Sequence, residues 1–166
     1  TLRERGINVM IAAPDGSPLF ANARRDEIRV DSFLPRRKYG DLRAVRTLAH
    51  SLNDFGATHG ILFRSQDIHL AALAHHRMPT IRWTFYQQMQ SAVMKRDFIH
   101  RWMHRHLSLW LTLTKRMRDD VLRCTAMPPD RVLVSFLGRN TSHFDPIKHS
   151  AVEARIALEL PIDKFI

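Results

Sequence analysis

Short apolar runs, separated by stretches with helical spacing, constrain the fold of this 166-residue chain more than any other feature. The runs are rich in β-branched and aromatic residues, as buried strands are. They lie at residues 7–14, 27–33, 60–64, 79–85, 107–114 and 131–136. Strands that alternate with helices are typical of βαβ units, which build a parallel sheet covered by helices. The sequence therefore predicts an α/β fold, a three-layer α/β/α domain with a mainly parallel sheet.

The stretches between these runs carry the signals of helices. In residues 42–55 the apolar side chains recur at steps of three and four, with Asp41 placed to cap the first turn and Gly56 to end the last one. A short helix is expected over residues 67–77. Another is expected over residues 115–123, with a threonine as its N-cap.

The charge of the chain points to anionic partners. Lysine and arginine outnumber aspartate and glutamate by 26 to 16, which gives a formal net charge of +10. A nucleic acid, an acidic membrane surface and phosphate-bearing small molecules all fit this charge. The single cysteine, Cys124, excludes an internal disulfide framework and favours a reducing compartment. Since no apolar run is long enough to span a bilayer, we expect a cytoplasmic protein.

The segment 114–146 holds the most informative motif of the chain. It contains a helix opened by a threonine, a Pro-Pro-acid-basic turn, and a strand that runs into a glycine elbow at Gly138, followed by Phe144 and Pro146. This order resembles the N-terminal domain of family 4 glycosyltransferases, which are enzymes of the two-domain GT-B architecture. Within the elbow, Phe136, Leu137 and Asn140 stand where the family usually has Pro, Asn and Asp.

The resemblance extends over nearly the whole chain. Residues 3–19 resemble the second strand of such domains, and residues 61–85 resemble the strand, acceptor loop, helix and Pro-led strand in their middle. The resemblance implies a Rossmann-like domain, one half of a GT-B fold, over residues 1–150. Residues 151–166 then correspond to a linker helix and the start of a C-terminal donor domain. By the same comparison the chain is expected to be truncated at both ends and to be inactive alone.

The function that the resemblance implies is glycosyl transfer. A sugar would pass from a nucleotide-sugar donor to a glycan or lipid-linked acceptor in envelope or exopolysaccharide synthesis, with no metal and no cofactor. The C-terminal domain would make most of the donor contacts. The alternative is a basic α/β nucleic-acid-binding module without catalysis. A nucleic-acid partner is the weaker reading, because the basic residues are spread over many helices and no recognition motif accompanies them.

The loop after the third apolar run supplies the expected catalytic group. In a parallel sheet, ligands bind outside the carboxyl ends of the strands. Asp67 there suits a base that takes or orients the proton of an acceptor hydroxyl. Arg64 suits a phosphate, and Ser65 and Gln66 complete the binding loop. The alternative for Asp67 is a plain helix N-cap.

Two further loops supply expected substrate contacts. After the Pro-led strand, where many relatives have a histidine, this chain has Tyr86 and Gln87, which suit sugar hydroxyls; ordinary aromatic packing is the alternative. At the elbow, Gly138 permits close backbone approach, Arg139 suits a phosphate, and Asn140 completes the loop. A plain turn with a solvated arginine is the alternative there.

The segment 89–107 has the pattern of a basic amphipathic helix, because apolar residues recur at four-residue steps between flanking basic ones. Such a helix can lie on an anionic bilayer, which would place the protein on the inner face of the cell membrane. The expected membrane-binding residues are Lys95, Arg96, Arg101, Trp102 and Arg105. The alternative is a helix packed on the sheet with a solvated basic edge. His100 and His104 lie one turn apart on it, but with no third ligand they predict no metal site.

Overall fold

The structure is a computed structural model that describes residues 2, 5–37, 40–136, 138 and 150–163. The chain divides into two compact units, residues 1–136 and 137–166. The second unit contains the helix α6 (Ala151–Ala157), which lies where the linker helix is expected. Ser150 and Glu153 form a capping box at its start.

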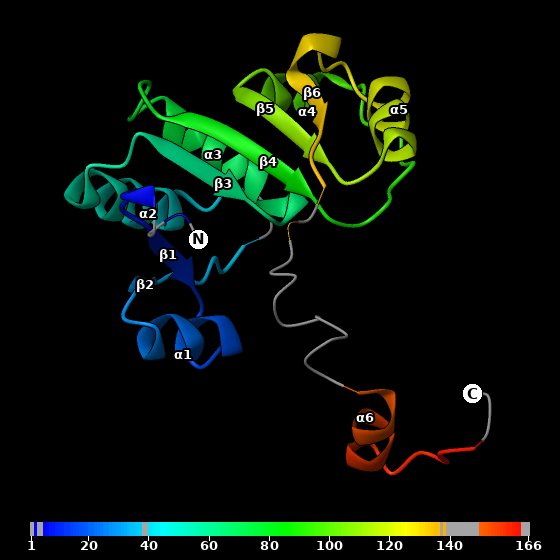
Figure 1. Cartoon of the computed structure of the whole chain (residues 1–166). Coiled ribbons are helices and arrows are strands. Elements are labelled where there is room, and N and C mark those ends of the chain that lie inside the picture. Colours follow the sequence, from blue (N-terminus) through cyan, green and yellow to red (C-terminus); the bar gives the residue numbers. More distant parts are fainter. Residues whose placement is uncertain (1, 3–4, 38–39, 137, 139–149, 164–166) are drawn as a thin grey trace. The chain divides into compact units, whose positions relative to one another are not determined.

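Within its described residues, the first unit contains two parallel sheets, shown in Figure 1. The small sheet pairs β1 (Met10–Ala13) with β2 (Arg29–Ser32). The larger sheet has the order β3 (His59–Leu62), β4 (Arg82–Gln87), β5 (Leu107–Thr112) and β6 (Val132–Val134). Every strand pair in both sheets is parallel. The mainly parallel α/β architecture predicted from the alternating runs is therefore confirmed.

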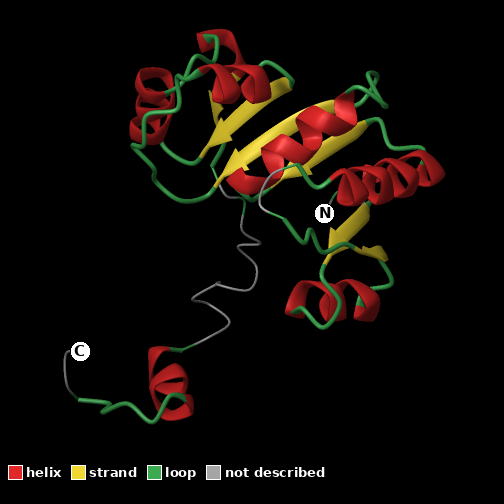
Figure 2. Cartoon of the chain, turned by 180° about the vertical axis from the view of Figure 1, so that it is seen from behind, coloured by secondary structure: helices red, strands yellow, loops and turns green. Residues whose placement is uncertain are grey.

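Helices connect the strands in the order that a βαβ fold requires (Figure 2). They are α1 (Pro18–Arg25), α2 (Leu42–Phe55), α3 (Ile68–His75), α4 (Phe98–His104) and α5 (Lys115–Cys124). A 3₁₀ turn at Ser65–Asp67 precedes α3. Six of the eight residues of α3 are buried, and three of them are alanines that pack in the core with larger side chains of α2 and β4. Such a helix belongs inside the domain.

The caps predicted for α2 and α5 are confirmed. Asp41 Oδ1 accepts a hydrogen bond from the Ala44 N–H at 2.9 Å, and its Oδ2 accepts from the N–H groups of Arg36 and Arg37 at 2.8 and 3.2 Å. Gly56 ends α2 at φ 70°, in the left-handed region that glycine adopts without strain. Thr114 caps α5 by accepting from the Met117 N–H.

Replacing Asp41 with asparagine should lower stability at neutral pH and have less effect in acid. The three backbone N–H groups hold the pKa of Asp41 below its ordinary value. Because the folded-state pKa is depressed, the stabilisation is fully present above the unfolded pKa of about 3.9 and is lost as the pH falls through the folded value. Urea midpoints of wild type and Asp41→Asn at pH 7 and pH 3 test this, with the exposed Asp119→Asn as control. A gap that is equal at both pH values would contradict it.

The predicted amphipathic helix over residues 89–107 is wrong. Only Phe98–His104 is helical, because the Asp97 side chain caps the His100 N–H at 3.1 Å and starts the helix in the middle of the segment. Before it, Lys95 forms an isolated parallel bridge with Thr125. After it, Leu107 already begins β5. The basic residues of this segment therefore do not share one helical face.

Candidate functional site

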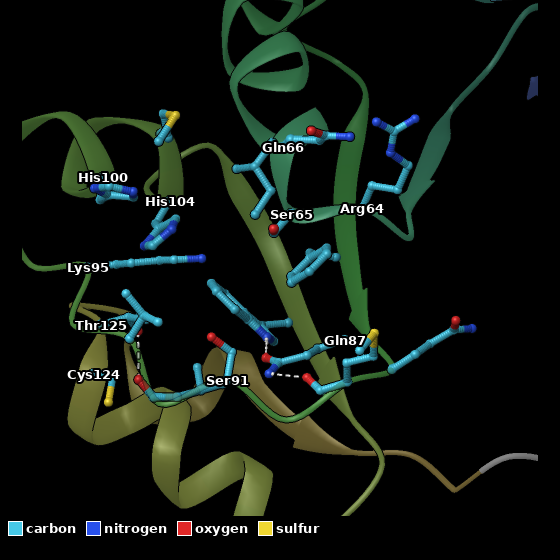
Figure 3. A pocket seen from close by; sticks show the side chains of 18 of the residues that line it. Arg64, Ser65, Gln66, Gln87, Ser91, Lys95, His100, His104, Cys124 and Thr125 are labelled. Carbon is cyan, nitrogen blue, oxygen red and sulfur yellow. Dashed lines mark hydrogen bonds between the residues drawn. The ribbon is translucent and has the colours of Figure 1, made fainter. Parts of the chain in front are cut away.

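A pocket of about 580 Å³ lies at the carboxyl ends of β3 and β4 (Figure 3). Arg64, Ser65 and Gln66 reach it from the turn that follows β3. The segment after β4, from Gln87 to Ser91, forms a second wall. Further walls come from Lys95, from His100, Met103 and His104 of α4, and from Val121, Cys124 and Thr125 at the end of α5. This is the edge at which parallel α/β sheets bind their ligands.

The pocket brings together some of the predicted site residues and leaves others apart. Arg64, Ser65, Gln66 and Gln87 line it. Tyr86 does not, because neighbouring residues of a strand face opposite sides; its hydroxyl donates to the Ser135 carbonyl at 3.3 Å, and its ring meets Phe63 edge-on. Its predicted contact with substrate is not part of this pocket.

Of the glycine elbow, residues 137–140, the structure describes Gly138. A Cβ added to Gly138 would meet no atom of the described residues within 4 Å. Arg139 and Asn140 lie outside the described residues. Their predicted contacts with a phosphate and a sugar stay predictions.

Asp67 occupies the N-cap position of α3, but its side chain caps no backbone N–H. Its Oδ2 lies 3.8 Å from Nε of Arg64, and the side chain is 23% exposed. Burial raises the pKa of Asp67 above its ordinary value, while the charges of Arg64 and His69 act against that rise. Among the described carboxylates with a shifted pKa it alone is raised. The carboxyl group follows the lining residues directly and is shifted in the direction that a general base needs.

Gln87 stabilises the wall of the pocket through two side-chain hydrogen bonds. It is buried, and its Oε1 accepts from the indole N–H of Trp110 at 2.9 Å while its Nε2 donates to the Met89 carbonyl at 2.8 Å. These bonds fix the segment that leaves β4. The predicted sugar contact would have to share an amide that is already engaged at both ends.

Replacing Gln87 with methionine should lower the free energy of unfolding by about 1–3 kcal/mol, because the buried Trp110 N–H loses its acceptor. Urea unfolding measures this, with the exposed neighbour Gln88→Met as control. The loss should be smaller in a Trp110→Phe background, where no N–H is left unpaired. An equal loss in both backgrounds would assign the effect to packing instead.

Hydrogen bonds fasten the segment 92–96 to the end of α5. The Lys95 N–H donates to the Cys124 carbonyl at 2.8 Å. The Arg96 guanidinium donates to the carbonyls of Thr125 and Leu122 at 3.1 and 3.2 Å, and the Cys124 thiol donates to the Ala92 carbonyl at 3.4 Å. Arg96 is thereby used to close the end of a helix, as cationic side chains often are. Lys95 is left with its side chain directed into the pocket (Figure 3).

His104 is a buried polar group of the pocket that sequence reasoning missed. It is 3% exposed, packs edge-on against Trp110, and its Nδ1 has no hydrogen-bond partner among the residues that the structure describes. Burial, and then the neighbouring His100 and Lys95, lower the pKa of His104 to about 4, against a smaller opposing effect of Asp97. The imidazole is therefore neutral at pH 7. The i, i+4 spacing with His100 was the one signal in the sequence that marked it.

The charged side chains that line the pocket are basic. Arg64 and Lys95 line it together with the histidines, and no lining residue is an aspartate or glutamate. In the described part of the chain, no three or more His, Cys, Asp or Glu side chains gather in a way that would hold a metal ion. The described helices include none with the length and apolar character needed to cross a membrane.

Comparison with known proteins identifies the fold. No protein-family model matches the sequence, and no curated protein matches it. Among solved structures, a glycosyltransferase of Rickettsia africae ESF-5 superposes with a TM-score of 0.79 at 12% identity, over 98% of this chain and 44% of the other. The Anabaena protein Alr3699/HepE, solved with UDP and glucose, gives 0.64 at 10% identity, over 90% and 42%. MurG of Acinetobacter baumannii gives 0.57 at 14% identity, over 86% and 40%.

All three structures have the GT-B architecture, and this chain spans less than half of each. The predicted resemblance to GT-B glycosyltransferases is confirmed at the level of the fold. The chain has the Rossmann-like fold of one half of such an enzyme.

Proposed function

We propose that this chain is the acceptor-side domain of a glycosyltransferase, which transfers a sugar from a nucleotide-sugar donor to a glycan or lipid-linked acceptor in envelope or exopolysaccharide synthesis. The observation that carries the proposal is the cationic pocket at the carboxyl edge of β3 and β4, in a fold shared with MurG and HepE. The complex of HepE with UDP and glucose supports a nucleotide sugar as donor. A second domain would hold most of that donor.

The proposed chemistry uses the turn after β3. The acceptor hydroxyl oxygen forms the new bond to the anomeric carbon of the donor sugar, and the Asp67 carboxylate takes the proton from that hydroxyl. The bond between the anomeric carbon and the diphosphate oxygen breaks, and the leaving nucleoside diphosphate keeps the electron pair. Arg64, Ser65 and Gln66 orient the acceptor. We propose that cationic side chains offset the charge of the diphosphate, so that the transfer depends on no metal and no cofactor.

We also propose that the domain lies on the inner face of the cell membrane, through a surface that differs from the predicted helix. Arg101 and Arg105 are exposed, whereas Lys95 lines the pocket, Arg96 binds the end of α5, and Trp102 stacks on His76. Large apolar side chains are exposed along the same segment, at Met89, Val93, Met94, Phe98 and Ile99. Apolar side chains beside arginines suit an anionic lipid surface.

The test uses the whole natural gene product that contains this chain. It is incubated with a panel of radiolabelled nucleotide sugars and a membrane extract as the source of acceptor. Label that enters lipid or polysaccharide would support the proposal and identify the donor. Absence of transfer from every donor, together with salt-sensitive binding of RNA or DNA, would replace the proposal with a basic nucleic-acid-binding module. The 166-residue chain alone is expected to transfer no sugar.

A further inference from the structure

We infer that the pocket binds the phosphate group of a phosphorylated acceptor sugar, with the Lys95 ammonium as its main ligand. This inference deepens the proposed function and rests on it, since it specifies the chemical class of the acceptor. It makes the acceptor an acidic sugar rather than a neutral glycan.

The charges around the pocket favour an anion at Lys95 over one at the other cationic groups. Arg64 already faces Asp67 at 3.8 Å, and His100 Nδ1 is hydrogen-bonded to Asp97. The Lys95 ammonium has no hydrogen bond and no ion pair with any residue that the structure describes, although its side chain is partly buried. A partly buried cation with no counter-ion is costly, and an anionic ligand would remove that cost. Lysine is a frequent phosphate ligand because it acts as a compact point charge.

The backbone of Lys95 is held in place before any ligand arrives. Its N–H donates a hydrogen bond to the Cys124 carbonyl, and the guanidinium of its neighbour Arg96 donates to two carbonyls at the same helix end. The Ala92 carbonyl accepts a hydrogen bond from the Cys124 thiol. Binding then has to order only the side chain, which lowers its entropic cost. As a result, the Lys95 side chain points into the pocket, whereas the Arg96 side chain binds the carbonyls at the end of α5.

An anion bound at Lys95 would also change the pKa of His104. Its protonation is opposed by burial first and then by the charges of His100 and Lys95. A phosphate bound at Lys95 would offset those charges, so the pKa of His104 should rise from about 4 when the ligand binds. Its titration, followed by NMR, is therefore a readout of occupancy of this pocket.

The remaining walls suit a sugar attached to the phosphate. The exposed ring of Phe63 lines the pocket with aromatic surface, and Ser65, Gln66 and Ser91 add hydroxyl and amide groups. A volume of about 580 Å³ lies within the range of small-molecule sites. Aromatic surface with a few placed polar groups is what a sugar ring requires, and bare phosphate would leave most of this surface uncovered.

The first experiment measures binding of glucose 6-phosphate, inorganic phosphate and glucose to the whole natural gene product by calorimetry. Glucose 6-phosphate should bind tightest, and Lys95→Met should weaken it by about tenfold, the effect of one hydrogen bond to a charged group. Lys115→Met, an exposed lysine at the start of α5, is the matched control and should leave binding unchanged. Equal binding by wild type and Lys95→Met, or no rise in the His104 pKa with glucose 6-phosphate, would overturn the inference.

The transfer assay separates the two proposals and the two sources of phosphate. Soluble sugar phosphates and polyprenyl-phosphate-linked sugars are compared as acceptors, and Lys95→Met should raise KM for whichever is used by about tenfold with kcat little changed. Transfer to neutral glycans that Lys95→Met leaves unaffected would overturn the anion site and keep the transferase. Lys95-dependent binding of phosphate without any transfer would keep the anion site and overturn the transferase.

Discussion

Replacing Gly60 with alanine is expected to lower the free energy of unfolding by about 3 kcal/mol or more, a large effect for one methyl group. A Cβ at Gly60 would lie 2.3 and 2.5 Å from Cζ3 and Cε3 of Trp83, closer than non-bonded carbons can approach. The indole is 2% exposed and sits in the centre of the core, so it has no free space to move into. Gly60 pairs with Trp83 across β3 and β4, which means that the clash strains the sheet itself. Urea unfolding of the two proteins measures the loss.

Two further variants establish that the indole causes the loss. In a Trp83→Leu background the ring is absent, so Gly60→Ala should cost much less than in the wild type. Gly138→Ala is the control, since a Cβ there meets no atom of the described part of the chain within 4 Å. A similar cost in both backgrounds would mean that alanine harms the strand for another reason. Without the clash, alanine in a strand would be expected to stabilise slightly over glycine.

The strands and the best-capped helices were predictable from sequence because local chemistry decides them. Leu42–Phe55 has an apolar stripe, a capping aspartate and a terminal glycine, and the structure uses all three. The helix α1 was not predicted, because its first residue and its N-cap lie in a Pro-Asp-Gly-Ser-Pro stretch, residues 14–18, that is typical of a turn. In the structure Ser17 caps that helix and Pro18 takes its first position, a place that proline tolerates well.

The segment 89–107 shows what local pattern cannot decide. Its four-residue apolar steps fit a helix. The Lys95 N–H, however, donates its hydrogen bond to the Cys124 carbonyl instead of to a helical carbonyl, and Asp97 caps a helix that begins after it. That choice depends on α5, which follows much later in the chain. The assignment of Lys95 and Arg96 to one membrane-facing surface failed for the same reason, since one lines the pocket and the other binds the end of α5.

The candidate site was predictable where it follows strand ends and was missed elsewhere. The rule that ligands bind at the carboxyl edge of a parallel sheet located Arg64, Ser65, Gln66 and Gln87. It could not tell that Gln87 faces the pocket while Tyr86 faces away from it, because that depends on the register of β4. It gave no reason to include Lys95 and His104, which reach the pocket from the segment before β5.

Replacing Asp67 with asparagine in the whole gene product is expected to lower kcat for sugar transfer by about 10²–10⁴-fold, the range typical of a lost general base. Asparagine keeps the shape of the side chain and removes its ability to accept a proton. Stability should hardly change, since the carboxylate caps no backbone group and its ion pair with the exposed Arg64 is long. Asp119→Asn, at an exposed carboxylate of α5, should retain full activity.

The pH dependence distinguishes a base from a merely structural carboxylate. Burial raises the pKa of Asp67, so the wild-type rate should rise with pH along a limb that lies above the ordinary range of aspartate, and Asp67→Asn should lack that limb. A base acts only as the transition state forms, so kcat and kcat/KM should fall together in this variant, whereas Lys95→Met should act on KM. Asp67→Asn with a rate within twofold of wild type, or with its pH limb intact, would remove Asp67 from the mechanism. The pocket would then have to activate the acceptor hydroxyl through another group, and the neutral, buried imidazole of His104 would be the next to replace.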